Sequence, residues 1–164
     1  MQPRRTILWT PLIGLLFLIG CSPDPAQLKD EAQQALSVGD FSQAREISAR
    51  ALGQVPESDK RLIWSLERIR LEALARDNQA AEAFETLERL AAEYPAQADA
   101  SLYLAIASYL EEAGGAGGAI DILVAGDKRF PEKSEQFEAE IQELHEAGSM
   151  DPAEIERLRS LGYL

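Results

Sequence analysis

Two hydrophobic patterns divide the chain. Residues 7–20 form one nearly continuous apolar run. Beyond Pro25 the chain is rich in Ala, Leu, Glu, Gln and Arg, which are strong helix formers. β-branched residues are sparse there and never alternate with polar ones over a useful length. The sequence after Pro25 is therefore predicted to be all-α.

The first two helices are predicted from their end signals. Asp24 is a good N-cap, Pro25 occupies the first helical position, and Gln27 is expected to close a capping box. This helix runs to about residue 38. Gly39-Asp40 then makes a tight turn, because glycine tolerates the left-handed conformation that ends many helices. A second helix is predicted from Phe41 to about residue 54.

This helix pair resembles a tetratricopeptide repeat (TPR), a unit of two antiparallel helices about 34 residues long. The resemblance is carried by Gly39-Asp40-Phe41, Ala44, Ala51-Leu52 and Pro56. It implies that Ala44 lets the two helices approach closely and that Pro56 ends the unit. It also implies an all-α fold, a right-handed array of antiparallel helix pairs.

Alignment on the closing proline finds the unit twice more, ending at Pro95 and at Pro131. Ala83 and Ala119 then occupy the close-packing position. Each is followed four residues later by a leucine that is expected to face the core. These leucines are Leu87 and Leu123. About three repeats are predicted.

The turns of the later copies depart from the first. Asp77-Asn78 forms the second turn, with Asn replacing Gly in the left-handed conformation, and the glycine-rich residues 114–118 form the third. The first helix of the second copy, over residues 60–76, is longer than usual. The third copy has Gly126 where the family prefers alanine.

A capping helix and a short final helix are predicted after the third copy. The first covers about residues 132–147 and buries Phe137, Ile141 and Leu144, which suits a helix that closes a repeat array. Residues 151–154 form a capping box that begins the second. Three apolar residues of this last helix are expected to share one face. They are Ile155, Leu158 and Leu161.

The C-terminal residues 156–164 resemble a short segment found in bacterial sulfatase-like and TPR proteins. Two interpretations follow. Tyr163 and Leu164 dock on the exposed end of the array, or the tail is recognised by another protein.

The N-terminal apolar run has the features of an export signal. Arg4 and Arg5 precede it, and residues 7–20 are too few to cross a hydrocarbon core, which needs roughly 20 apolar residues. Residues 18–21, Leu-Ile-Gly-Cys, resemble the lipobox of bacterial lipoproteins. The resemblance implies cleavage before Cys21, which becomes acylated, for example with palmitate. Ser22 in place of Asp favours the outer membrane facing the periplasm, with the inner (cell) membrane as the alternative.

Four segments are thus expected. They are a cleaved signal peptide (1–20), a lipidated tether (21–24), a TPR-like domain with its capping helix (25–147), and a C-terminal helix and tail (148–164).

Charge and chemistry narrow the function. The net charge is −12, and it becomes −14 without Arg4 and Arg5 of the signal, which disfavours binding to nucleic acid or anionic lipid surfaces. Cys21 is the only cysteine and His145, expected to face solvent, the only histidine. No nucleophile, phosphate-loop or calcium-loop motif occurs. No enzyme activity, cofactor or metal is predicted.

Two functions are considered. In the first, the chain is a lipid-anchored adaptor or assembly scaffold that binds another envelope protein in the groove lined by the first helices. By alignment with the family, that lining comprises Lys29, Gln33, Arg68, Glu72, Leu104, Ser108 and Glu111. In the second, a small structural or regulatory lipoprotein acts through its C-terminal tail or its own oligomerisation.

Overall fold

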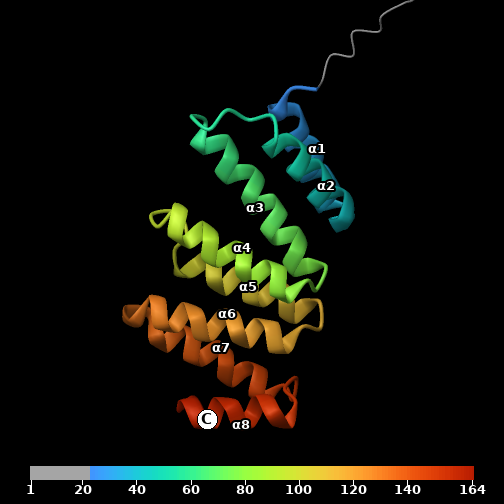
Figure 1. Cartoon of the computed structure of the whole chain (residues 1–164). Helices are drawn as coiled ribbons and strands as arrows, with labels where there is room; N and C mark the ends of the chain where they lie inside the picture. The colour runs from blue at the N-terminus through green and yellow to red at the C-terminus, as the bar shows by residue number, and fades with distance from the viewer. Residues whose placement is uncertain (1–22) are drawn as a thin grey trace, which may run out of the picture.

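A computed structural model describes residues 23–164, and within this range the chain is all-helical, with no strand. The expected signal peptide and Cys21 lie outside the described residues. None of the described helices is long and apolar enough to cross a bilayer. The prediction of an all-α fold is confirmed for the described part of the chain (Figure 1).

Eight α-helices and one short 3-10 helix follow one another between residues 23 and 164. Their bounds are α1 Pro25–Ser37, α2 Phe41–Leu52, α3 Lys60–Arg76, α4 Ala80–Glu93, α5 Ala100–Glu112, α6 Ala116–Arg129, η1 Pro131–Lys133, α7 Ser134–Glu146 and α8 Pro152–Leu161.

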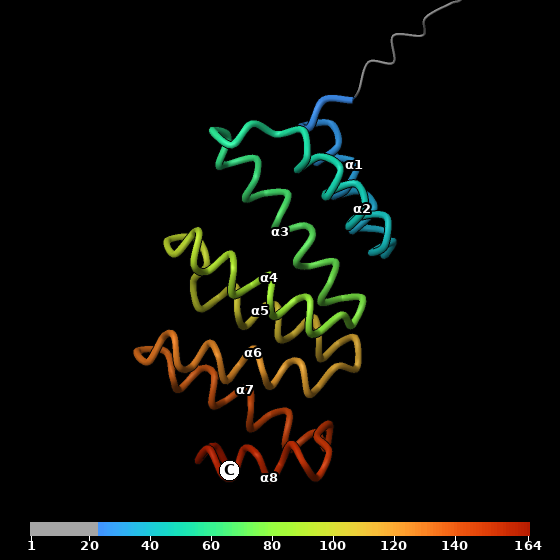
Figure 2. Tube along the Cα trace, in the orientation of Figure 1, coloured from blue at the N-terminus to red at the C-terminus, as the bar shows by residue number. Residues whose placement is uncertain are grey.

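The helices pack as antiparallel neighbours in two layers. α1, α3 and α5 contact one another in that order, and α4 contacts α6 in the second layer. Figure 2 shows the chain passing back and forth between its two sides, so that consecutive helices run in opposite directions. The first layer therefore brings together helices that are far apart in the sequence.

One turn geometry recurs at the ends of α1, α3, α5 and α7. A residue with positive φ follows each helix, and the backbone N–H after it donates to a carbonyl five residues back, as Asp40 does to Ala35 at 2.9 Å. This is the Schellman motif, which satisfies the last carbonyls of a helix. The residues with positive φ in these four turns are Gly39, Asn78, Gly114 and Gly148, and Gly162 has the same conformation after α8. The expectation that Asn78 replaces glycine is confirmed.

The turn after α7 joins the last two helices. A capping helix and a short final helix were expected, and the structure has both, as α7 and α8. α8 runs alongside α6, since Arg157 pairs with Asp121 and the Tyr163 hydroxyl donates to Asp127. Leu161 was expected on one face with Ile155 and Leu158, but it is 46% exposed, whereas Leu158 is fully buried and Ile155 half-buried.

The buried residues form two clusters that share α3. The smaller cluster joins α1 and α2 to one side of α3, and the larger one joins the other side of α3 to the helices from α4 to α8. The predicted close-packing residues Ala44, Ala83 and Ala119 are each 0% exposed. These values confirm the predicted burial of the three alanines. Small side chains at such positions let paired helices approach closely.

Of the two capping boxes that the sequence predicts, the structure has one. Gln27 closes no capping box, because the Asp24 side chain accepts from the Ala26 N–H at 3.1 Å instead. The capping box of α8 is confirmed, with 2.8 Å for each of the two bonds between Asp151 and Glu154.

The third turn is also shorter than expected. Only Gly114 and Gly115 precede α6, whereas Gly117 and Gly118 lie within its first turn. A Cβ atom at Gly118 would overlap the side chain of Ala80 in α4. This glycine is therefore needed for the close packing of α6 on α4 rather than for a flexible loop.

Gly126, which departs from the family preference for alanine, lies against Phe137 of α7. A Cβ atom at Gly126 would lie 2.7 Å from Phe137 Cζ and closer still to another ring atom. Phe137 is fully buried and stacks on Phe130, with 6.5 Å between the ring centroids. The glycine makes room for this aromatic residue at the α6–α7 contact.

We predict that Gly126→Ala destabilises the fold. Overpacking costs about 1–3 kcal/mol, whereas replacing a helical glycine by alanine gains at most about 1 kcal/mol. Urea unfolding should therefore show a net loss of up to about 2 kcal/mol. Gly53→Ala is the matched control, since its Cβ would make ordinary contacts at 3.6 and 3.8 Å. A Gly126→Ala protein at least as stable as the wild type would contradict this packing.

Candidate functional site

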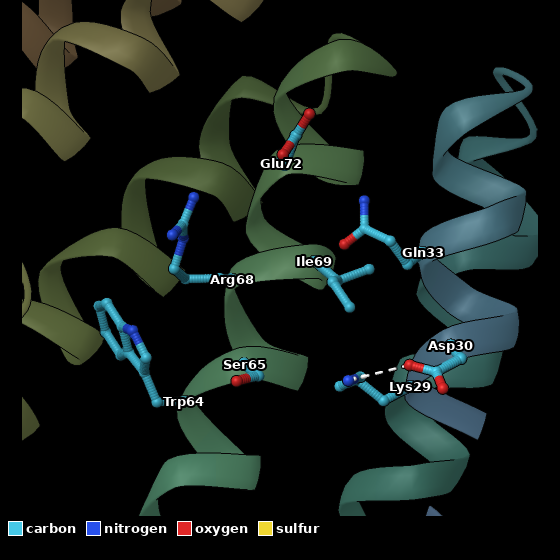
Figure 3. A pocket seen from close by; sticks show the side chains of 8 residues that line it. All are labelled: Lys29, Asp30, Gln33, Trp64, Ser65, Arg68, Ile69 and Glu72. Atoms are coloured by element: carbon cyan, nitrogen blue, oxygen red, sulfur yellow. Dashed lines mark ion pairs between the residues drawn. The ribbon is translucent and has the colours of Figure 1, made fainter. Parts of the chain in front are cut away.

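A pocket of about 330 Å³ lies between α1 and α3. Figure 3 shows its lining side chains extending from the two facing helices. It is lined by Lys29, Asp30 and Gln33 of α1 and by Trp64, Ser65, Arg68, Ile69 and Glu72 of α3.

The spacing of the α3 residues explains why they share one face. Trp64, Arg68 and Glu72 follow one another at intervals of four residues, which places side chains above one another on a helix. Lys29 and Gln33 are related in the same way on α1. The burial of Ile69 against α1 and α2 fixes the rotation of α3. This rotation directs Trp64, Arg68 and Glu72 toward the pocket.

A second pocket, of about 290 Å³, continues this surface to the start of α5. Trp64 and Arg68 line both pockets, so the two form one surface, which we call the α1–α3–α5 groove. The further lining of the second pocket is Gln97, Asp99, Ser101, Leu102 and Ala105.

The structure brings together four of the seven residues that were expected to line a groove. Lys29, Gln33, Arg68 and Glu72 all line the first pocket. The three residues from α5 do not line either pocket. Leu104 is half-buried against the larger cluster, and Ser108 and Glu111 are exposed further along α5.

Trp64 is the most important residue that the sequence analysis missed. It is half-buried, and its ring centroid lies 5.3 Å from that of Tyr94 in a tilted arrangement. Its position four residues before Arg68 was a signal that could have found it. Asp30, Ser65 and Ile69 were also missed, because the alignment with the family assigns only one lining residue to each helical turn.

The charges of the groove differ in how they are compensated. Lys29 pairs with Asp30 at 2.9 Å, and Glu72 pairs with Arg76 at 2.9 Å. Arg68 forms no ion pair with any residue from 23 to 164, although it is exposed at the junction of the two pockets. Arg68 therefore offers a free guanidinium beside an aromatic ring, and polar side chains surround both.

The far end of the first layer carries carboxylates instead. Burial, followed by the charges of Glu143 and Glu111, raises the pKa of Glu140. Among residues 23–164, no group of three or more His, Cys, Asp or Glu side chains is arranged to hold a metal ion. The first layer thus presents mixed charges, with no cluster of metal-ligating side chains in the described part.

His145 was expected to face solvent, and this was wrong. The residue is half-buried on α7, and its Nδ1 atom is inaccessible and has no hydrogen-bond partner.

The C-terminal residues lie on the domain. Tyr163 donates its hydroxyl to Asp127 at 2.5 Å, and its carbonyl accepts from Gln142 at 2.6 Å. Burial, followed by the hydrogen bond to Asp127, raises the pKa of Tyr163. Leu164 packs against the larger cluster. These contacts are those expected of a docking tail.

Comparison with known proteins adds no relative. The chain matches no protein-family model, no curated protein and no solved structure. The residues of the groove are therefore the basis for a functional proposal.

We predict that Ser101→Ala raises the pKa of Asp99 in the groove. The Ser101 hydroxyl donates to Asp99 at 2.6 Å and is the main cause of the lowered pKa of this carboxyl. A lowered folded-state pKa stabilises the fold above the usual Asp pKa, and this stability is lost as the pH falls through the folded-state value. Carboxyl NMR titration checks the shift, with the exposed Ser108→Ala as control. An unchanged Asp99 pKa would contradict the geometry.

Proposed function

We propose that this chain is a lipid-anchored, TPR-like protein of the bacterial envelope that binds an extended segment of another protein in the α1–α3–α5 groove. The observation that carries the proposal is the position of Arg68 and Trp64, at the junction of two pockets that span three helices. The partner is another envelope protein, and the role is that of an adaptor or assembly scaffold. No metal, cofactor or nucleic acid takes part.

The chemistry of the groove suits an extended peptide. A peptide backbone has donors and acceptors along its whole length, and the groove offers side chains that can pair with both. Gln33, Ser65 and Gln97 supply donors and acceptors, while Arg68 supplies a charged donor. Trp64 provides a large and rigid apolar surface, of the kind that often contributes strongly to binding energy.

The recurring helix pair supports the TPR-like part of the proposal. Four pairs share the same turn between their helices, and Ala44, Ala83 and Ala119 are buried at equivalent positions. Stacked pairs of this kind commonly form extended binding surfaces from their first helices. This arrangement favours binding at the groove over catalysis.

The lipid anchor rests on the sequence before the described residues. The lipobox-like residues 18–21 and the short apolar run before them support acylation at Cys21. Because α1 begins at Pro25, only residues 22–24 separate the proposed anchor from the first helix. The groove would then lie close to the membrane surface, on the periplasmic side of the outer membrane.

Reversal of the groove charge tests the binding site. Arg68→Glu should reduce recovery of the partner by about tenfold or more in affinity capture from detergent-solubilised envelopes. The substitution replaces the charged donor that attracts acceptor groups of the partner by a carboxylate that repels them. Arg61→Glu is the matched control, because Arg61 is exposed on the same helix and lines neither pocket. Circular dichroism should show that both variants keep the fold.

The results separate the two candidate functions. Equal recovery with Arg68→Glu and Arg61→Glu would contradict groove binding. Recovery that is lost only when residues 151–164 are deleted from a chain that still folds would favour recognition through the tail.

Replacement of Cys21 tests the anchor. Cys21→Ala should abolish incorporation of labelled palmitate and prevent the mass increase of the mature N-terminus, because the thiol is the proposed acylation site. Membrane fractionation and intact-mass analysis check both effects. Ser22→Ala, next to it in the chain, should leave acylation intact, and a Cys21→Ala protein that still carries a lipid would refute the assignment.

A further inference from the structure

A separate pocket of about 630 Å³ lies between α4, α6 and α8. It belongs to the second layer of helices, so it does not share a residue with the α1–α3–α5 groove. The face of α6 that lines it repeats at helical spacing through Asp121, Val124, Ala125 and Lys128. This spacing makes the pocket a continuous strip along α6, with α4 and α8 on its two sides.

The floor of this pocket is apolar. Phe84 of α4 and Ala125 of α6 are half-buried, and Val124 is buried between them and the larger cluster. Half-buried apolar side chains in a pocket of this size can accept one apolar side chain of a ligand.

The rim of the pocket is cationic. Arg157 pairs with Asp121, whereas Glu88 accepts a hydrogen bond from the neutral Tyr103 hydroxyl at 2.7 Å and keeps its negative charge. Lys128 and Arg129 form no ion pair within the described part of the chain. The three cations Lys128, Arg129 and Arg157 therefore exceed the two carboxylates Glu88 and Asp121 by one, and the pocket carries a net positive charge in a chain whose net charge is −12.

Arg129 is also held in place. Its Nη2 atom donates to the Ala91 carbonyl at 2.6 Å, which links α6 to the end of α4. This bond orients the guanidinium without neutralising it, so its remaining donors are free for a ligand. A fixed cation loses less conformational entropy on binding than a mobile one.

We propose that the α4–α6–α8 pocket binds a short acidic segment of a partner protein, in which a carboxylate lies beside a Leu- or Phe-sized side chain. The apolar side chain contacts Phe84, Val124 and Ala125. The carboxylate pairs with Arg129 and Lys128, since charge-assisted hydrogen bonds to carboxylates are among the strongest available to arginine. Charge complementarity selects this occupant over a basic one.

This site also gives the C-terminal helix a role. Arg157 of α8 forms one wall of the pocket, and its pairing with Asp121 keeps that carboxylate from repelling an acidic ligand. The tail therefore contributes to binding as part of a pocket rather than as a free recognition segment.

Fluorescence anisotropy on the full-length chain in detergent tests the proposal. The probe is the fluorescein-labelled peptide Gly-Ser-Asp-Leu-Glu-Phe-Gly, and the matched probe carries Lys in place of Asp and Glu. Lys128→Glu should weaken binding of the acidic probe about tenfold, because like charges then face each other. Lys133→Glu makes the same charge change at another exposed residue and should have an effect of less than about twofold.

Several results would overturn the proposal. They are the absence of saturable binding of the acidic probe to the wild-type chain, equal binding of the lysine probe, and equal weakening by Lys128→Glu and Lys133→Glu. Displacement of the acidic probe by glycerol 3-phosphate at the same concentration as the peptide would indicate a site for phosphate groups and would also overturn it. Because Arg68 lies in the other layer, Arg68→Glu should leave this binding unchanged, so the two sites are tested separately.

Discussion

The burial of α3 on two sides is the constraint on which the rest of the structure depends. Leu66, Ile69 and Ala73 pack against α1 and α2, and a second set of residues packs against the helices that follow. α3 is thus the helix through which the first pair is joined to the larger cluster. The second set is Leu71, Leu74 and Ala75. The length of α3, which departs from the family pattern, is explained by this double role.

The same constraint produces the groove. Two buried sides leave a third side of α3, which carries Trp64, Arg68 and Glu72 between α1 and α5. The buried residues fix the rotation of α3 and so place these three side chains on the groove side. The opposite layer follows the same logic, since the close approach of α6 to α4 at Gly118 places Lys128 and Arg129 beside Phe84.

Much of this fold could be predicted from the sequence because its signals are local. Turn residues such as Gly39 and Asn78, and the alanines at close contacts, act within one helix pair. What failed depends on contacts between distant segments. The reason for Gly126 is visible only with Phe137 beside it, and Gly118 resembles a loop residue until Ala80 is placed against it. The lining residues on α1 and α3 were predicted correctly, but those predicted on α5 do not line the groove. The reason is that the second pocket lies at the N-terminal part of α5.

Site-specific photocrosslinking in the intact envelope tests the central claim most directly. A photoreactive amino acid at Gln33 lies in the groove, whereas one at Gln43, also exposed, lies on α2 outside it. Our account predicts one discrete adduct with an envelope protein from position 33 and none from position 43. Adducts of equal yield from both positions, or from position 43 alone, would contradict it.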